Sequence, residues 1–144
     1  VAQLLKLSLP EDRQMGSIFT KKDGLLIGDN HIIPASDDID KYLHPIIILV
    51  NRQCYSSCNI YTAYASQIDG VTIIGDTTGG GSGLAVAREL GNGWQYRFSA
   101  GKITLADGTE LENGIDPDIK VSTDENDFAK DKDAILDKAI ELLK

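Results

Sequence analysis

The feature that most constrains the fold is the stretch 45–60, PIIILVNRQCYSSCNI, in which a run of large apolar residues stops and a helical pattern begins. The run from Ile46 to Val50 lies between a proline and a polar cluster, which predicts a fully buried strand. Ser56 and Ser57 stand where the next helix would begin. A hydroxyl at such a strand-to-helix turn is exposed, and the free amides of the helix can stabilise an anion beside it. The stretch therefore predicts the geometry of a serine nucleophile.

The segments around this helix predict a parallel pair of strands. Apolar residues at three- and four-residue intervals continue the helix to about Gln67, and Asp69-Gly70 ends it. Residues 71–75, VTIIG, then form a second short apolar strand. A strand, a helix and a strand joined by such short connections imply parallel pairing with a right-handed crossover. The expected fold class is α/β.

The other segments predict antiparallel strands and a final helix. Residues 16–26 predict a strand, a Lys-Lys-Asp-Gly turn and the start of a second strand, whereas residues 28–42 are polar and acidic and predict a loop. The glycine-rich loop 76–83 precedes two alternating segments separated by Gly91-Asn92-Gly93, a strong hairpin signal. One apolar stripe along 135–143 predicts a helix.

Length and charge exclude several classes of protein. A chain of 144 residues is long enough for one domain with a real core. The net charge of −8, without any cluster of Lys and Arg, argues against a nucleic-acid surface. No apolar run reaches the length of a membrane span, so we expect no membrane insertion by this segment.

The first residues and the acidic segment carry two further expectations. Residues 1–10, VAQLLKLSLP, resemble the end of a helix without its beginning, so we expect the chain to be part of a longer protein. Asp37, Asp38 and Asp40 form a charge run that predicts solvated surface. They lack the spacing and central glycine of a calcium-binding loop, and no metal site is expected.

Cys54 and Cys58 lie on either side of the two serines. Because Cys54 would precede the helix, helical spacing does not fix their separation, and a disulfide cannot be judged. The favoured interpretation is two small buried apolar side chains. Reactive cysteine chemistry is a third interpretation, although neither residue has a visible histidine partner.

Two local features have an ordinary structural explanation beside the functional one. Ser56 can simply cap the helix, since serine is among the best capping residues. The loop Gly79-Gly80-Gly81-Ser82-Gly83 lacks the lysine and the helix start of a phosphate-binding loop. It predicts either a flexible loop or a place where the backbone of a bound peptide approaches closely.

Three ordered motifs carry a family resemblance: VNRQCYSSCNIYTA, VTIIGDTTGGGSG and GTELENGIDPDIKV. In order and spacing they resemble the serine peptidase family of C-terminal processing (tail-specific) proteases, the tricorn core protease and the retinoid-binding-protein repeats. That family shows a buried strand ending in Asn or Asp, a nucleophile turn like Thr-Ala-Ser-Ala-Ser-Glu, a Gly-Glu-x-Thr-x-Gly loop and a closing Gly-Val-x-Pro-Asp. The resemblance covers residues 45–121 well and the first third of the chain only by topology.

The resemblance assigns roles position by position. Ser56 matches the nucleophile, and the backbone amide of Ser57 would then help to hold the oxyanion. The next three positions, which are Ala-Ser-Glu in the family, are Ser57, Cys58 and Asn59 here. The other matched positions are Asp76, Thr78 and Gly80 in the loop and Ile115, Pro117 and Asp118 in the closing motif.

The general base is where this chain departs from the processing proteases. Gly81 stands where they carry a catalytic lysine, and Lys102 and Lys120 lie outside the matching motif. The chain is closer to the lysine-less, tricorn-like branch, in which an upstream histidine activates the serine and a glutamate supports it. Glu112 is the counterpart of that glutamate, or else a solvated residue of a hairpin. The base is expected upstream of Val1.

The resemblance also implies a fold: a crotonase/ClpP-like spiral of ββα units with a mixed sheet and a C-terminal helix. Residues 1–144 would be one unit, the C-terminal portion of a peptidase catalytic domain.

The expected function is that of a serine endopeptidase acting on unfolded or C-terminal protein segments, bound by strand addition near Gly79 to Leu84. No cofactor is expected. The family implies a bacterial, extracytoplasmic location in the periplasm or cell envelope. The alternative is a non-catalytic binding module that kept the fold, which Gly81, Asn59 and the two cysteines would fit.

Overall fold

The computed structural model describes residues 9, 11–35, 44–123, 127, 130 and 132–144. These residues form three small sheets with strand orders β2-β1-β7, β3-β4-β8 and β5-β6. The elements are β1 (Arg13–Lys22), β2 (Leu25–Ile33), β3 (Ile46–Val50), α2 (Ser57–Ala65), β4 (Val71–Gly75), β5 (Ala85–Glu89), β6 (Gln95–Ser99), β7 (Gly101–Leu105), β8 (Ile119–Lys120) and α4 (Ala134–Leu142). The predicted α/β class and the final helix are confirmed.

The predicted parallel pair forms the centre of the fold. β3 and β4 pair in parallel, from Ile46 opposite Val71 to Val50 opposite Gly75, and β8 adds in parallel to β4. The prediction that β3 is fully buried is wrong. Val50 is buried, whereas Leu49 is 41% exposed. The reason is that β3 lies at an edge of its sheet, where side chains have fewer neighbours.

The antiparallel pairs agree with the turn signals, with one correction. The β1–β2 hairpin turns at Asp23 and Gly24, both with positive φ. Residues 28–33, predicted as loop, continue β2 and pair with β1, ending with Ile33 opposite Arg13. Their polar composition concealed the strand because most of β2 faces solvent. Two predictions lie outside the described residues. They are the helix end at residues 1–10, of which only residue 9 is described, and the solvated acidic run of Asp37, Asp38 and Asp40.

The predicted mixed sheet is not found in the described part of the chain. Parallel pairs occur only in β3-β4-β8, and antiparallel pairs occur in the other two sheets. The physical reason is the kind of connection, because parallel strands need a crossover such as α2 whereas hairpins close with tight turns.

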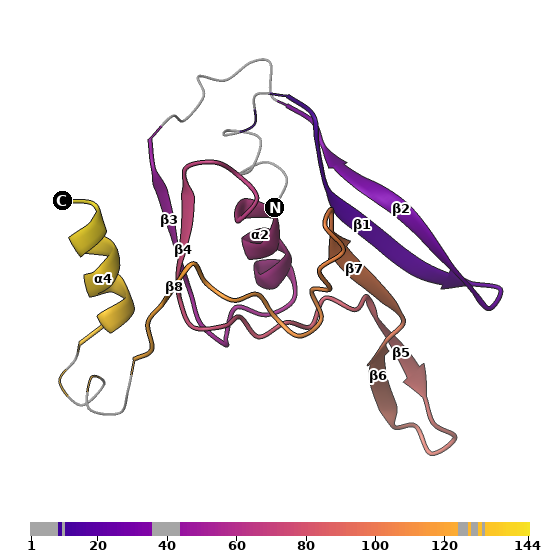
Figure 1. The fold of residues 1–144 in the computed structure, drawn as a ribbon. Coiled ribbons are helices and arrows are strands. Elements are labelled where there is room, and N and C mark those ends of the chain that lie inside the picture. Colours follow the sequence, from indigo (N-terminus) through magenta and orange to yellow (C-terminus); the bar gives the residue numbers. More distant parts are fainter. Residues whose placement is uncertain (1–8, 10, 36–43, 124–126, 128–129, 131) are drawn as a thin grey trace.

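Helix α2 lies between the parallel sheet and the β2-β1-β7 sheet, and α4 covers the other side of the parallel sheet (Figure 1). The fully buried Ala63 and Tyr64 of α2 pack into a cluster with Met15 and Ile103. Ile74 of β4 packs with residues of α4. The parallel sheet therefore has a buried cluster on each of its two faces.

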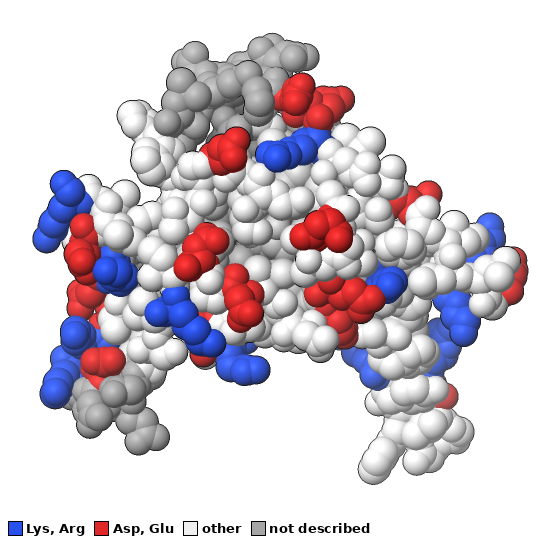
Figure 2. Space-filling model, in the orientation of Figure 1, with Lys and Arg blue, Asp and Glu red and all other residues white. Residues whose placement is uncertain are grey.

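Charged side chains of both signs are scattered over the face shown in Figure 2, where several acidic groups lie on a mostly uncharged middle. This distribution agrees with the net charge of −8. None of the described helices is long and apolar enough to span a bilayer.

Candidate active site

Ser56 occupies the turn that joins β3 to α2, directly before the first helical residue. Its backbone has φ 58° and ψ −116°, and its side chain makes no capping hydrogen bond. The structure therefore contradicts the interpretation of Ser56 as an ordinary cap. Positive φ with this ψ is glycine-favoured backbone, and a non-glycine residue in such a region costs about 1–3 kcal/mol. Strained strand-to-helix turns of this kind present nucleophilic serines in other hydrolases.

Hydrogen bonds hold this turn against the glycine-rich loop. The Ser56 amide donates to the Gly80 carbonyl at 2.8 Å, and the Gly79 amide donates to the Cys54 carbonyl at 2.9 Å. The Ser56 carbonyl accepts from the Ile60 amide at 3.0 Å, which begins the helix. The turn thus keeps its strained backbone through contacts on both sides.

The hydroxyl of Ser56 opens onto a cleft of about 510 Å³. Tyr55, Ile60, Leu84, Ala85 and Phe98 give the cleft a partly apolar wall. The other lining residues are Ser56, Ser57, Gly81, Ser82, Arg97 and Ser99. The cleft is large enough for a peptide side chain, and its lining includes one charged residue.

The start of α2 supplies the electrophilic side of the cleft. Ser57 is the first residue of the helix and lines the cleft. The first amides of a helix have no acceptor within it, and the helix dipole favours negative charge there. No acidic side chain lies in the first turn of α2 to compete. The Ser57 amide is therefore suited to stabilise an oxyanion.

The glycine-rich loop packs mainly against its own chain. A Cβ on Gly79 would lie 2.3 Å from the Arg52 carbonyl oxygen, and one on Gly80 would lie 2.1 Å from that of Glu112. Gly81 and Ser82 line the cleft, whereas Gly79, Gly80 and Gly83 do not. The sequence predicted that the backbone of a bound peptide could approach these glycines closely. In the structure, backbone carbonyls of the same chain lie in this space. Substrate binding by the loop stays a prediction.

Tyr55 explains why glycine occupies position 81. A Cβ on Gly81 would lie 2.0 Å from Cζ of the Tyr55 ring, and Gly81 has φ +74°. The ring fills the space beside the loop that any side chain at position 81 would need. Lysine cannot occupy this position unless Tyr55 moves.

Asn59, which replaces the acid of the family motif, is a completely buried hydrogen-bond hub. Its Nδ2 donates to Ser82 Oγ at 2.8 Å and to the Leu111 carbonyl at 2.7 Å, and its Oδ1 accepts from Thr78 Oγ1. Thr78 Oγ1 in turn accepts from the Ile115 amide at 2.7 Å. Asn59 thereby ties the helix to both glycine-containing motifs.

Glu112 lies behind the cleft and has one unsatisfied oxygen. Its Oε1 accepts from Ser99 Oγ at 2.8 Å, and Ser99 lines the cleft. Among the described residues nothing hydrogen-bonds to Oε2, although this atom is buried. Glu112 is partly buried, and its free Oε2 can accept a hydrogen bond from a further group.

No histidine or lysine lines the Ser56 cleft in the described structure. His31 Nδ1 is hydrogen-bonded to the Tyr64 hydroxyl at 2.8 Å, between β2 and α2. Burial raises the pKa of Tyr64 above its ordinary value, so this phenol stays protonated. Lys102 is paired with Glu110 at 2.7 Å. The described lining of this cleft therefore offers neither of the two side chains that serve as base in the resembled branches.

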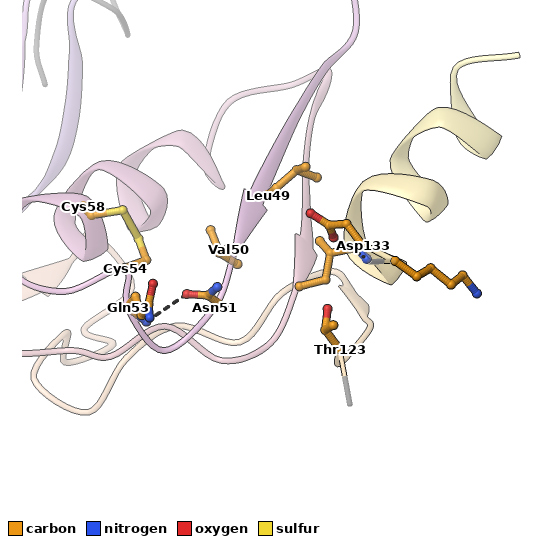
Figure 3. A pocket seen from close by; sticks show the side chains of 10 residues that line it. Leu49, Val50, Asn51, Gln53, Cys54, Cys58, Thr123 and Asp133 are labelled. Carbon is orange, nitrogen blue, oxygen red and sulfur yellow. Dashed lines mark hydrogen bonds between the residues drawn. A yellow bond between two sulfur atoms is a disulfide. The ribbon is translucent and has the colours of Figure 1, made fainter. Parts of the chain in front are cut away.

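Cys54 and Cys58 form a disulfide, which corrects the favoured interpretation of two buried apolar side chains. Cys54 is buried but Cys58 is exposed, and neither is a free thiol available for cysteine chemistry. Sequence spacing could not show this, because the turn at Ser56 brings the two Cα atoms to 5.0 Å. The disulfide lines a second cavity, which faces the start of α4 (Figure 3).

The closing motif holds the parallel sheet in place. Asp118 Oδ2 accepts from the Ile73 amide at 2.8 Å, and the Thr78 amide donates to the Ile115 carbonyl at 3.0 Å. Asp76 Oδ1 accepts from the Thr77 amide at 2.8 Å. These motif residues therefore form hydrogen bonds that stabilise the fold.

Comparison with known proteins decides the family. The profile of Peptidase family S41 matches residues 12–121. The chain belongs to peptidase family S41. The S41 assignment confirms the resemblance drawn from the three sequence motifs.

Individual S41 relatives agree with this assignment. The chain is 31% identical over 104 residues to the carboxy-terminal processing protease CtpA of Bacillus subtilis (strain 168), covering 72% of the chain and 22% of CtpA. A crystal structure of a candidate peptidase from Parabacteroides merdae ATCC 43184 superposes with a TM-score of 0.88 and 35% identity, over 99% of the chain and 46% of that protein. The tricorn protease shares the fold, with a TM-score of 0.68 and 23% identity, over 99% of the chain and 13% of tricorn. The chain spans less than half the length of each of these proteins.

Three residues of this S41 cleft do not stand out in the sequence. Tyr55 and Ser99 are placed by contacts with Gly81 and Glu112, which no local pattern reveals. Arg97 could have been found from strand alternation, because it lies two residues from Ser99 on β6 and so faces the same side.

We predict that Ser56→Gly is more stable than Ser56→Ala by roughly 0.5–2 kcal/mol. Both variants remove the hydroxyl, but only glycine relieves the positive φ. The free energy of unfolding from urea titrations measures the difference. Equal stability would show that the turn is not strained.

We predict that Asn59→Leu destabilises the protein by about 2–4 kcal/mol, since it leaves several buried polar groups without partners. Ser66→Ala is the matched control, because Ser66 Oγ makes a single local bond to the Ala63 carbonyl. It should cost under about 1 kcal/mol in the same unfolding assay. Similar losses for both variants would contradict the role of Asn59 as a hub.

Proposed function

We propose that this chain carries the nucleophile of a serine-type endopeptidase, and that Ser56 is that nucleophile. The observation that carries the proposal is the strained backbone of Ser56, which presents an uncapped hydroxyl to a cleft at a helix start. Strain of this kind persists where the surrounding structure enforces it, and it clusters at functional sites. Membership of family S41 supports the same chemistry.

In the proposed reaction, Ser56 Oγ attacks a peptide carbonyl carbon and gives its proton to a base. The carbonyl oxygen becomes an oxyanion, which accepts a hydrogen bond from the Ser57 amide. The amine then leaves with a proton, and water hydrolyses the acyl-enzyme. The cleft's lining in the described structure contains no histidine or lysine, so the base comes from another part of the protein.

Glu112 is the proposed partner of that base. Its buried Oε2 has no hydrogen-bond partner among the described residues, so it can accept a hydrogen bond from an imidazole N–H. A carboxylate in this position fixes the orientation of a histidine and stabilises its protonated form. This arrangement resembles the tricorn-like branch.

The proposed substrate is an extended peptide, from an unfolded or C-terminal protein segment, that adds to the edge of β5. In the described structure β5 pairs only with β6, and Ala85 at its start lines the cleft. Exposed sheet edges bind peptides in this way. A peptide on this edge would place its backbone beside Gly81 and Ser82.

The complete domain is proposed to be a crotonase-like spiral, with this chain as the C-terminal part of one catalytic domain. The chain spans 46% of the Parabacteroides merdae protein that it resembles over almost its full length. An extracytoplasmic location is proposed from the disulfide, since such bonds persist in oxidising compartments.

A non-catalytic peptide-binding module is the second candidate. The observation that favours it is that glycine occupies position 81, with positive φ and the Tyr55 ring beside it, so that the lysine of the processing proteases is absent from this position. Such a module would keep the cleft and lose the chemistry.

A serine-reactive fluorophosphonate probe distinguishes the two candidates in the full-length protein. The peptidase predicts labelling at Ser56, loss of labelling in Ser56→Ala, and retention in Ser57→Ala, which keeps the backbone amide. Mass spectrometry identifies the labelled residue. A folded full-length protein that is not labelled would support the binding module.

Arg97 is predicted to favour substrates with an acidic residue. It is the only charged residue that lines the described cleft, and no ion pair of its guanidinium is found among the described residues. Arg97→Gln should lower kcat/KM for an acidic peptide by roughly two- to fivefold, the effect of one exposed charge pair.

The comparison peptide replaces the acidic residue with its amide, and its kcat/KM should not change. Lys102→Gln is the matched control, because that charge pairs with Glu110 outside the cleft. The preference should weaken in high salt. An equal loss with both peptides would exclude a role in charge recognition.

A further inference from the structure

We propose that the Cys54–Cys58 disulfide positions Ser56 for reaction, so that reducing it lowers the reactivity of the serine. This inference rests on the proposed function of Ser56. The disulfide closes a ring of the five residues Cys54 to Cys58, with Ser56 in the middle. The strained residue is therefore inside the cross-linked segment.

The two cysteines connect the two elements that meet at the turn. Cys54 is 7% exposed and packs with Val50 and Ile73 at the end of the parallel sheet. Its Sγ also lies 3.4 Å from Thr62 Oγ1 of α2. Cys58 is the second residue of α2. The cross-link fixes the start of the helix relative to the end of the strand.

Side-chain packing does little to hold the residues between the cysteines. Tyr55 is 61% exposed, and Ser56 and Ser57 are also exposed. Within the ring, one backbone hydrogen bond, from the Cys58 amide to the Tyr55 carbonyl at 3.2 Å, supports the turn. Across to the loop, the Ser56 amide bonds to Gly80. The Gly79 amide also bonds to the Cys54 carbonyl, so the covalent link restrains the positive φ of Ser56 together with these hydrogen bonds.

The disulfide is accessible without entry to the Ser56 cleft. It lines the separate cavity of about 460 Å³ shown in Figure 3, which shares no lining residue with that cleft. Cys58 is exposed, so a thiolate can approach the bond from this side. A reductant can therefore act on the disulfide while the cleft holds a substrate.

Reduction by a dithiol is a balanced two-electron exchange. One thiolate of the reductant attacks a disulfide sulfur, a mixed disulfide forms, and the second thiol closes the reductant's own disulfide. Cys54 and Cys58 are left as two thiols. They are the only cysteines of this chain, so no other thiol of the chain can pair with them.

After reduction, the backbone at Ser56 can relax toward negative φ, and only the strained fraction stays reactive. Backbone strain of this type corresponds to a factor of about 5 to 150 in population. The expected result is a fall of that order in kcat and in the labelling rate at Ser56. KM should change little, because the cleft residues outside the turn keep their places.

The test measures peptide turnover and fluorophosphonate labelling of the full-length protein before and after treatment with dithiothreitol, and again after reoxidation. The double variant Cys54→Ala/Cys58→Ala should match the reduced protein and should not respond to dithiothreitol. Cys54→Ser/Cys58→Ser provides a second variant if the first does not fold. The folded fraction is measured by circular dichroism on the same samples.

A fall in kcat per folded molecule that reoxidation reverses would support the proposal. Unchanged kcat and labelling in the reduced, folded protein would overturn it. A loss that only follows the folded fraction would also overturn it, because it would show a purely stabilising bond. Absence of labelling in the oxidised protein would instead refute Ser56 as nucleophile, and this inference with it.

Discussion

The buried amide of Asn59 is the interaction on which the arrangement of the site depends. It bonds to Thr78, Ser82 and the Leu111 carbonyl, so one helix residue fixes the segments before and after the β5–β6 hairpin. An unsatisfied buried amide is costly, and these partners therefore keep the helix and both loops in one register. The position of the Ser56 cleft follows from that register.

The site combines a rigid element, helix α2, with a strained residue, Ser56. Helix α2 is held between two sheets, with Ala63 and Tyr64 fully buried, whereas Ser56 at its start is exposed and has positive φ. The rigid part fixes the helix amides, and the strained part places Ser56 in the lining of the cleft beside them. Exposure and strain therefore occur together at Ser56, inside the segment that the disulfide closes.

Sequence patterns predicted what depends on local chemistry. The apolar run 46–50, the helix start near Ser56 and the Asn-Gly hairpin were all predicted from the sequence, because each depends on residues close together in the chain. The helix ended at Ala65 rather than Gln67, and residues 28–33 formed a solvent-facing strand without apolar alternation. The disulfide, the hub at Asn59 and the Ser99–Glu112 bond depend on contacts between distant segments, or on a backbone turn that no local pattern encodes.

The contact between Tyr55 and Gly81 also limits how this sequence can evolve. A lysine at position 81 would meet the Tyr55 ring and an unfavourable φ, so the substitution alone is expected to be harmful. A smaller residue at position 55 would remove the clash but would gain nothing by itself. The two positions are therefore epistatic, since residues in direct contact do not act additively. The effect of a lysine at position 81 therefore depends on the side chain at position 55.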